Sequence, residues 1–356
     1  MTTGKPSSRL LGIQTARGVA ALLVVLYHTG RGIALPQYTG QIPFGGLFEF
    51  GHAGVDFFFV LSGFIIYFVH NADIGVPESL PRYLRRRLVR IYPIYWVVTA
   101  LVVLLAMMRP GNEAPELGYI VRSLLLIPQR PDPILNVAWT LVFEMAFYVL
   151  FAMAILSRRL GIALVVIWLG LIIAGRFINH QAPLRHVLMS FSNLEFILGI
   201  LAAHITLHHP SHRPLLLATV AAIAFAGFGL MENAGAMDAA GPVSELMFAA
   251  ASVGLVIGLA TAERQGRLHI GPGAAFLGNA SYSLYLIHTI VIGLAARALG
   301  LLGLIKILPA AAIFGVVAAA AILAGAALHA FVELPLLRML GTEKGRRDRH
   351  QPALPQ

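Results

Sequence analysis

The stretch IQTARGVAALLVVLYHTGRG, residues 13–32, decides the fold class of this chain. From Val19 to Tyr27 it is almost wholly apolar, and as a helix of about 20 residues it matches the thickness of the hydrocarbon core of a bilayer. Because lipid offers no hydrogen-bond partners to a backbone, such a segment must be helical. It therefore predicts a transmembrane α-helix.

Apolar stretches of similar length recur along the chain. Hydrophobic residues make up 58% of it and charged residues only 12%, about half the charged fraction of an average soluble domain. The ten predicted spans cover residues 13–32, 52–70, 91–108, 137–156, 161–175, 187–207, 214–230, 242–260, 281–299 and 307–332. The expected fold class is all-α, a polytopic transmembrane helix bundle of about ten spans. It forms one domain over residues 1–340, and we expect the short polar tail, 341–356, to be disordered.

The basic residues indicate the orientation. The net charge of +10 would suit a nucleic-acid ligand, but the basic side chains lie in short connections between apolar segments, which positive-inside topology explains without such a partner. With a cytoplasmic N-terminus, the inner connections hold 17 Lys and Arg residues and the outer connections hold 8, with Arg17 inside the first span. Both termini are therefore expected in the cytoplasm, and no nucleic-acid partner is expected.

Ionisable residues inside the spans are candidate site residues, because a charged group in lipid is costly. Arg17 and His28 of the first span are eleven residues apart, about 16 Å and three helical turns, so both project from nearly the same face. A polar stripe of this kind suits a cavity filled with water or substrate. The alternative is that Arg17 snorkels to the interface and that His28 is a hydrogen-bonded packing residue.

Two carboxylates from other spans are expected at the depth of His28. Asp56 begins the second span, and Glu144 lies in the outer half of the fourth, where Thr140 and Tyr148 share its polar edge. Considered separately, Asp56 could form an ion pair with an arginine, and Glu144 could form a hydrogen bond between helices. Taken together, a histidine beside carboxylates is typical of general base catalysis. We therefore predict a functional cluster of His28, Asp56 and Glu144.

A basic stripe precedes the third span, where Arg82, Arg86 and Arg90 recur every four residues. Anchoring to anionic lipid would produce the same stripe. Arginine side chains also suit the phosphate oxygens of a cytoplasmic ligand, so the stripe predicts either a lipid anchor or a docking site.

Three later features carry less weight. Ser281, Tyr285 and His288 share one face of the ninth span, and Glu333 is expected to pair with a neighbouring arginine. The chain contains no cysteine, and the histidines within 208–212 lie in an interfacial loop without carboxylate company. No metal cofactor is therefore expected.

These motifs together resemble the acyltransferase-3 family of membrane O-acyltransferases. Arg17 and His28 fit its arginine–ten residues–histidine motif in the first span. The other matches are GVDFFFVLSGF at 54–64, RLVRIYPIY at 87–95, WTLVFEMAFY at 139–148, SYSLYLIH at 281–288 and ELP at 333–335. They follow in order over nearly the whole chain, which looks most like the stand-alone exopolysaccharide O-acetyltransferases of the family. The departures are His52-Ala53, where many members have a glycine-rich pair, and Thr140, which replaces a frequent serine.

The resemblance implies a multi-pass protein of the bacterial inner (cytoplasmic) membrane. It implies transfer of an acyl group from cytoplasmic acyl-coenzyme A, with acetyl-CoA as the expected donor, to a hydroxyl of an exported or lipid-linked glycan such as exopolysaccharide. It also implies that His28 is the catalytic histidine and that Arg17 handles the donor or supports the structure. The expected partners are then glycan, acyl-CoA and membrane lipid.

On this hypothesis His28 acts as a general base or briefly accepts the acyl group itself, and Asp56 or Glu144 fixes its tautomer. The expected donor-binding residues are Arg17, Arg86, Arg87, Arg90 and Tyr95, and the expected acceptor-binding residues are Trp139, Thr140 and Tyr148.

The alternative function is a proton-coupled transporter of a small anionic or sugar substrate, because intramembrane His, Asp and Glu also serve as proton relays. A transporter is expected to show inverted repeats, and the two halves of the sequence show no such symmetry. Thermal stabilisation by the coenzyme A donor would favour the enzyme.

Overall fold

The computed structural model describes residues 10–108, 115–178, 182–239 and 241–341. Every regular element in these ranges is helical, which confirms the expected all-α class. The long helices are α1 (Leu11–Ile33), α2 (Gly54–His70), α3 (Leu80–Met107), α5 (Trp139–Leu156), α6 (Arg158–Ala174), α8 (Asn193–His208), α9 (Pro214–Asn233), α10 (Pro242–Arg264), α11 (Pro272–Leu301) and α12 (Ala310–Leu328). Apart from Gly341, the predicted tail lies outside the described residues.

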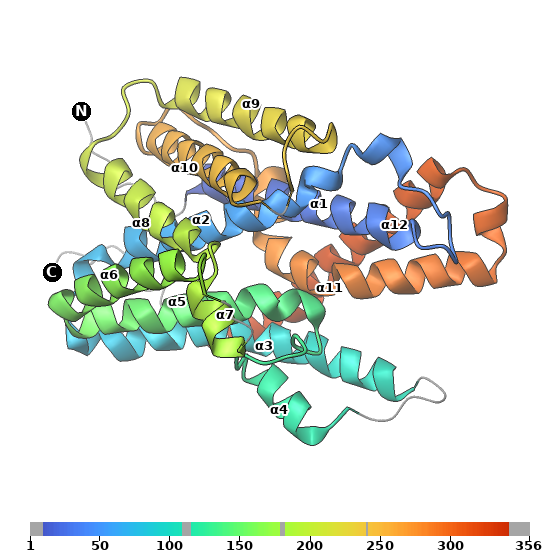
Figure 1. Ribbon diagram of the computed structural model, residues 1–356, viewed down its shortest axis with the longest axis horizontal. Coiled ribbons are helices and arrows are strands. Elements are labelled where there is room, and N and C mark those ends of the chain that lie inside the picture. Colours follow the sequence, from blue (N-terminus) through green and yellow to red (C-terminus); the bar gives the residue numbers. More distant parts are fainter. Residues whose placement is uncertain (1–9, 109–114, 179–181, 240, 342–356) are drawn as a thin grey trace, which may run out of the picture.

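Short elements connect or extend these helices. They are the α-helices α4 (Leu117–Leu124), α7 (Pro183–Met189) and α13 (Leu334–Met339), the π-helical turn His329–Glu333, and 3₁₀ turns at Pro43–Gly46, Glu49–Ala53, Asn71–Asp73, Pro77–Ser79, Asn136–Ala138 and Leu304–Lys306. Figure 1 shows the long helices running roughly along one axis, with α9 and α10 on one side of the bundle and α3 and α5 on the other.

The helix ends gather at two opposite faces of the bundle. At one face, Glu263 at the end of α10 accepts a hydrogen bond from the backbone N–H of Leu11 (2.6 Å), and Arg85 near the start of α3 donates to the carbonyl of Leu340 after α13 (3.1 Å). We call this end the basic face, because exposed arginines gather there: Arg82, Arg85, Arg86, Arg158, Arg213 and Arg267.

At the opposite face, the end of α1 meets the connections that follow it and α9. Arg31 forms an ion pair with Glu49 (2.7 Å), and Asn233 donates to the carbonyl of Leu47 (3.1 Å). Successive long helices therefore alternate in direction, with α1 leaving the basic face and α12 with α13 returning to it.

Within the described chain, nine helical segments are long and apolar enough to cross a bilayer, and they match nine of the ten predicted spans. They are Leu11–Ile33, Glu49–Asp73, Pro77–Met107, Asn136–Leu156, Pro183–His208, Pro214–Asn233, Pro242–Arg264, Gly273–Leu301 and Ala310–Met339. The remaining predicted span, 161–175, is the shorter helix α6, with 17 residues. Because α6 begins beside Gly75, near the basic face, and ends beside Met189, near the opposite face, it also runs the length of the bundle.

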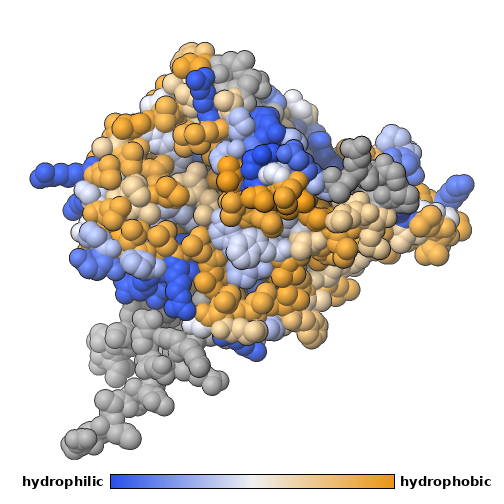
Figure 2. Space-filling view, turned by 90° about the horizontal axis from the view of Figure 1, so that it is seen from below, coloured by the Kyte–Doolittle hydropathy of each residue, from blue (hydrophilic) through white to orange (hydrophobic). Residues whose placement is uncertain are grey.

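The outer surface of the bundle is apolar. Leu104, Val166 and Ile223 on the peripheral helices are 55%, 63% and 67% exposed. Figure 2 shows apolar side chains covering much of the face turned toward the viewer. Soluble proteins rarely expose apolar surface of this extent, whereas contact with lipid tails requires it. The chain is therefore a polytopic helical membrane protein.

Glycines bring the central helices into close contact. A Cβ atom on Gly63 of α2 would lie 2.0 Å from the carbonyl oxygen of Phe196 on α8, and one on Gly199 of α8 would lie 2.0 Å from the carbonyl oxygen of Val60. Similarly, Gly278 of α11 touches the backbone of α1. Small residues allow helices in a membrane to approach this closely. These contacts hold α1, α2 and α11 around the cavity described below.

We expect Gly199→Ala to lower the thermal unfolding midpoint of the detergent-solubilised protein. The added methyl group must push the α2 backbone away, and overpacking of this kind costs about 1–3 kcal/mol. The matched control is Gly170→Ala in α6, where an added Cβ meets no atom within 4 Å. Equal midpoints for the two variants would contradict the tight α2–α8 contact.

Candidate active site

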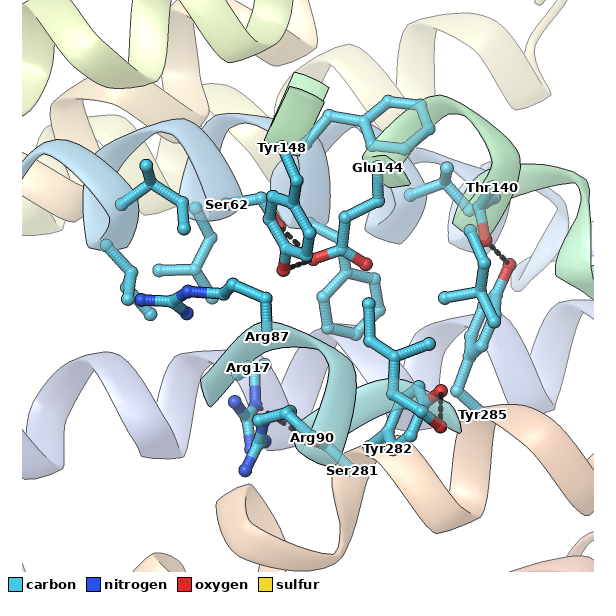
Figure 3. A pocket seen from close by; sticks show the side chains of 18 residues that line it. Arg17, Ser62, Arg87, Arg90, Thr140, Glu144, Tyr148, Ser281, Tyr282 and Tyr285 are labelled. Carbon is cyan, nitrogen blue, oxygen red and sulfur yellow. Dashed lines mark hydrogen bonds between the residues drawn. The ribbon is translucent and has the colours of Figure 1, made fainter. Parts of the chain in front are cut away.

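A central pocket lies between α1, α2, α3, α5 and α11 and contains about 880 Å³ of open space, its mouth included. Its polar lining residues are Arg17, Ser62, Arg87, Arg90, Thr140, Glu144, Tyr148, Ser281, Tyr282 and Tyr285. Figure 3 shows the three arginines toward one end of the pocket and the Thr140–Tyr285 pair at the other. The arginine end faces the basic face, because Arg87 and Arg90 belong to the first turns of α3.

Arg17 is held in place by α11. Its Nε donates to Ser281 Oγ (2.7 Å), and its Nη2 donates to the carbonyl of Gly278 (2.6 Å). Because these bonds satisfy much of the guanidinium inside the bundle, Arg17 is fixed as a wall of the pocket. It does not snorkel freely to the interface.

Arg87 and Arg90 supply the other two guanidinium groups at this end of the pocket. Arg87 donates from Nη2 to His70 Nε2 (2.9 Å), while its Nε is buried without a partner. His70 in turn donates from Nδ1 to Asp73 (2.7 Å), which fixes the tautomer that accepts from Arg87. Within the described residues, Arg90 makes no direct hydrogen bond and interacts electrostatically with Arg17 and Glu333.

The polar edge of α5 forms the opposite wall, as its spacing predicted. Glu144 accepts hydrogen bonds from Ser62 Oγ (3.1 Å) and from the hydroxyl of Tyr148. Thr140 and Tyr285 share a hydrogen bond of 2.9 Å between their hydroxyl oxygens. Since Glu144 is the only carboxylate among the lining residues and three arginines face it, the pocket has an excess of positive charge. Such a cavity suits an anion with phosphate groups.

His28 lies beyond the Thr140–Tyr285 end of the pocket and contacts His288 of α11. Its Nδ1 is 3.2 Å from His288 Nε2, and the two rings meet edge to face with centroids 4.9 Å apart. The ring of His288 also packs against Tyr285, at 5.7 Å between centroids. Tyr285 thus connects the lining of the pocket to the histidine pair.

The hydrogen bonds fix the tautomers of both histidines. His288 Nδ1 lies 2.6 Å from the carbonyl of Tyr285, and His28 Nδ1 lies 2.9 Å from the carbonyl of Val24. A carbonyl only accepts, so each Nδ1 carries a proton in the neutral ring, and His288 Nε2 can accept from His28. His28 Nε2 is then an unprotonated base, and none of the described residues bonds to it. This is the arrangement that a general base requires.

Asp56 does not join His28, which corrects the predicted cluster. Its carboxyl group interacts with the carboxyl groups of Glu195 on α8 and of Glu245. Equal depth along two helices does not set the direction of the side chains: Asp56 and Ser62 of α2 differ by six residues, or about 120° around the helix. Ser62 therefore faces the central pocket, while Asp56 faces α8.

Glu144 is likewise bonded within the pocket and not to His28. The expectation that Asp56 or Glu144 fixes the tautomer of His28 is therefore not met, because Val24 and His288 do so. His288 is the site residue that sequence reasoning underrated. Its position on the Ser281–Tyr285 face was the available signal, but its partner in α1 lies 260 residues away along the chain.

The other predicted site residues are distributed as follows. Arg17, Arg87, Arg90, Thr140 and Tyr148 line the central pocket. Arg86 is exposed and is not one of its lining residues. Tyr95 is fully buried and donates to the carbonyl of Ser123 (2.5 Å), on the side of α3 that packs against α4. Trp139 lines a second pocket.

Comparisons with known proteins agree with this architecture. A family model described as an acyltransferase domain (Acyl_transf_3) matches residues 10–329. The exopolysaccharide production protein ExoZ of Rhizobium meliloti (strain 1021) is 33% identical over 307 residues, covering 83% of this chain and 92% of that protein. The acyltransferase MdmB of Streptomyces mycarofaciens is 28% identical over 385 residues, covering 94% of each chain. No solved structure gives a significant match.

Proposed function

This chain belongs to the acyltransferase-3 family, and on that premise we propose that it transfers an acetyl group from acetyl-coenzyme A to a hydroxyl of an exported or lipid-linked glycan. One observation carries the proposal. Arginines line one end of the central pocket, and Tyr285, which lines the other end, packs against His288, the hydrogen-bond partner of His28.

The donor enters from the basic face. The positive-inside rule supports a cytoplasmic location for this face, where acyl-coenzyme A is available, in a multi-pass protein of the bacterial inner membrane. The guanidinium groups of Arg87 and Arg90 bind the phosphates of acetyl-coenzyme A. The acyl-carrying arm extends along α5 toward Thr140 and Tyr285. Arg17 is about 16 Å of helix rise from His28, so the path spans roughly half of the bilayer core.

In the proposed reaction the acetyl group passes directly from the sulfur of coenzyme A to the acceptor hydroxyl oxygen. His28 Nε2 takes the proton of the acceptor hydroxyl while the hydroxyl oxygen attacks the thioester carbonyl carbon. A C–O bond forms, the C–S bond breaks, and the proton passes from His28 to the leaving sulfur, giving the ester and free coenzyme A thiol. His288 is a positioning residue: by accepting from Nδ1 of His28, it keeps the proton on that nitrogen and aims Nε2 at the acceptor.

The likeness to ExoZ supports the choice of acceptor class. ExoZ is named for exopolysaccharide production, and the likeness to it covers most of both chains. A polysaccharide hydroxyl on the far side of the membrane also fits a site whose base lies toward the opposite face.

The decisive experiment is reconstitution of the full chain in nanodiscs with acetyl-CoA labelled in the acetyl group. The acceptor is oligosaccharide released from the exopolysaccharide of the source bacterium and saponified to remove ester-linked groups. We expect label to appear in the oligosaccharide as an alkali-labile ester, together with one free thiol per transfer. Uptake of solute into proteoliposomes along a proton gradient, without acetyl-CoA binding, would instead support the transporter and refute the acyltransferase.

A further inference from the structure

A second pocket, with about 920 Å³ of open space, lies on the other side of α5 from the central pocket. The first turns of α5 form a wall shared by both pockets. Thr140 and Glu144 line the central pocket, whereas Trp139 and Phe143 line the second one. The remaining walls come from the connection before α5, from α7 and the residues after it, and from the first turn of α10, so this pocket belongs to the opposite face.

Aromatic rings form one wall of the second pocket. Trp139 and Phe143 meet edge to face at 5.6 Å, and Phe143 meets His186 of α7 in the same way at 5.9 Å. Trp139 is only partly buried, and it lines the pocket, so part of its surface is open to a ligand. An aromatic ring packs well against the apolar C–H face of a sugar, and its geometry is held here by its neighbours.

Polar groups stand on the other walls. Glu245, in the first turn of α10, has a carboxylate oxygen that is buried without a hydrogen-bond partner. Gln129 is oriented by its bond to Ser123 Oγ (2.9 Å). A buried acceptor left unpaired costs free energy, which a ligand hydroxyl donating to Glu245 would recover.

The charges distinguish the two pockets. The central pocket sets three arginines against one carboxylate, whereas the second pocket is lined by Arg130, Asp132 and Glu245, with no excess of positive charge. Phosphate groups are therefore attracted to the central pocket and not to the second one. An aromatic wall, a carboxylate with one unpaired oxygen and a lining without excess positive charge together suit a neutral ligand rich in hydroxyl groups.

We propose that the second pocket binds a neutral sugar residue of the acceptor, with the sugar face on Trp139 and a hydroxyl donating to Glu245. This inference rests on the proposed function and adds to it the place where the glycan is held. The donor and this sugar residue then bind on opposite sides of α5, and the reacting hydroxyl belongs to another part of the same glycan. A change in one pocket is therefore expected to affect the binding of one substrate only.

The test compares steady-state constants of full-length variants in nanodiscs, with acetyl-CoA and the saponified oligosaccharide as substrates. We expect Trp139→Ala and Glu245→Gln each to raise the KM for oligosaccharide on the order of tenfold, with the KM for acetyl-CoA changed less than about twofold. Trp139→Phe should restore much of the lost affinity. The matched control is Phe177→Ala, an aromatic residue near the same face that is 85% exposed.

Trp139→Ala with an oligosaccharide KM equal to that of the Phe177→Ala control would overturn the inference, as would an equal rise in both KM values. If the wild type transfers no acetyl group, the proposed function fails, and direct binding still tests the pocket. Saturable quenching of tryptophan fluorescence by the oligosaccharide, abolished in Trp139→Phe, would then support the sugar site, and its absence would overturn it.

Discussion

Replacing His28 by glutamine is expected to lower kcat by about 10²–10⁴-fold, the usual contribution of a general base, while acetyl-CoA still binds. The physical reason is that His28 Nε2 is the unbonded nitrogen of the histidine pair, whereas Nδ1 is already engaged by Val24 and His288. Glutamine fills a similar volume but lacks a basic nitrogen. The measurement is the rate of label transfer to oligosaccharide, beside the dissociation constant of acetyl-CoA measured by calorimetry on the same preparation.

Variants of His288 provide the control for this result. His288→Gln keeps an acceptor that can reach Nδ1–H of His28, whereas His288→Leu removes it. We expect kcat to fall clearly more in His288→Leu than in His288→Gln, with the KM for acetyl-CoA unchanged in both. A His28→Gln protein that transfers acetyl groups at the wild-type rate would contradict the role of His28. Equal kcat values for the two His288 variants would contradict the positioning role.

The second large effect is expected from neutralising Arg87 and Arg90 together. These two arginines line the end of the central pocket that faces the basic face. A hydrogen bond to a charged group is worth about 1.5–3 kcal/mol. We therefore expect Arg87→Gln/Arg90→Gln to weaken acetyl-CoA binding by at least about 100-fold, with the KM for oligosaccharide unchanged.

The control is the double variant Arg158→Gln/Arg159→Gln, which removes two exposed charges near the basic face but outside the pocket. Surface charges act at long range and are screened by salt, so its effect should be small and should vanish at about 0.5 M salt. If both double variants bind acetyl-CoA equally well, the donor does not dock on the arginines of the pocket.

The resemblance to the family, read from short motifs in order along the chain, is confirmed by the match over residues 10–329. The helical class and nine of the ten spans were also predictable. A backbone segment in lipid must satisfy its own hydrogen bonds and is therefore helical, and the length of each apolar stretch gives the length of its span. The exception, α6, shows the limit of that rule: its 17 residues lie at the lower bound for a membrane helix, and only its neighbours show that it runs between the two faces.

For the candidate site, the sequence predicted only the depth of each residue along its helix. The position of Arg17, His28, Asp56 and Glu144 along their helices follows from the sequence, and with it their approximate depth. Which side chains face one another depends on the rotation of each helix about its own axis, at about 100° per residue, and on how the helices pack. Close contacts such as Gly199 against Val60 and Gly278 against Gln14 set that rotation.

The sequence by itself therefore determined a helical membrane bundle, its basic face and the set of polar residues inside it. The tertiary structure decided how those residues are grouped. It paired His28 with His288, turned Asp56 toward Glu195, and placed Glu144 with Tyr148 opposite the arginines. The reason is physical. The composition of a single segment decides whether it enters the membrane. A contact between polar groups, in contrast, requires two helices to present matching faces, and these helices are often hundreds of residues apart in the chain.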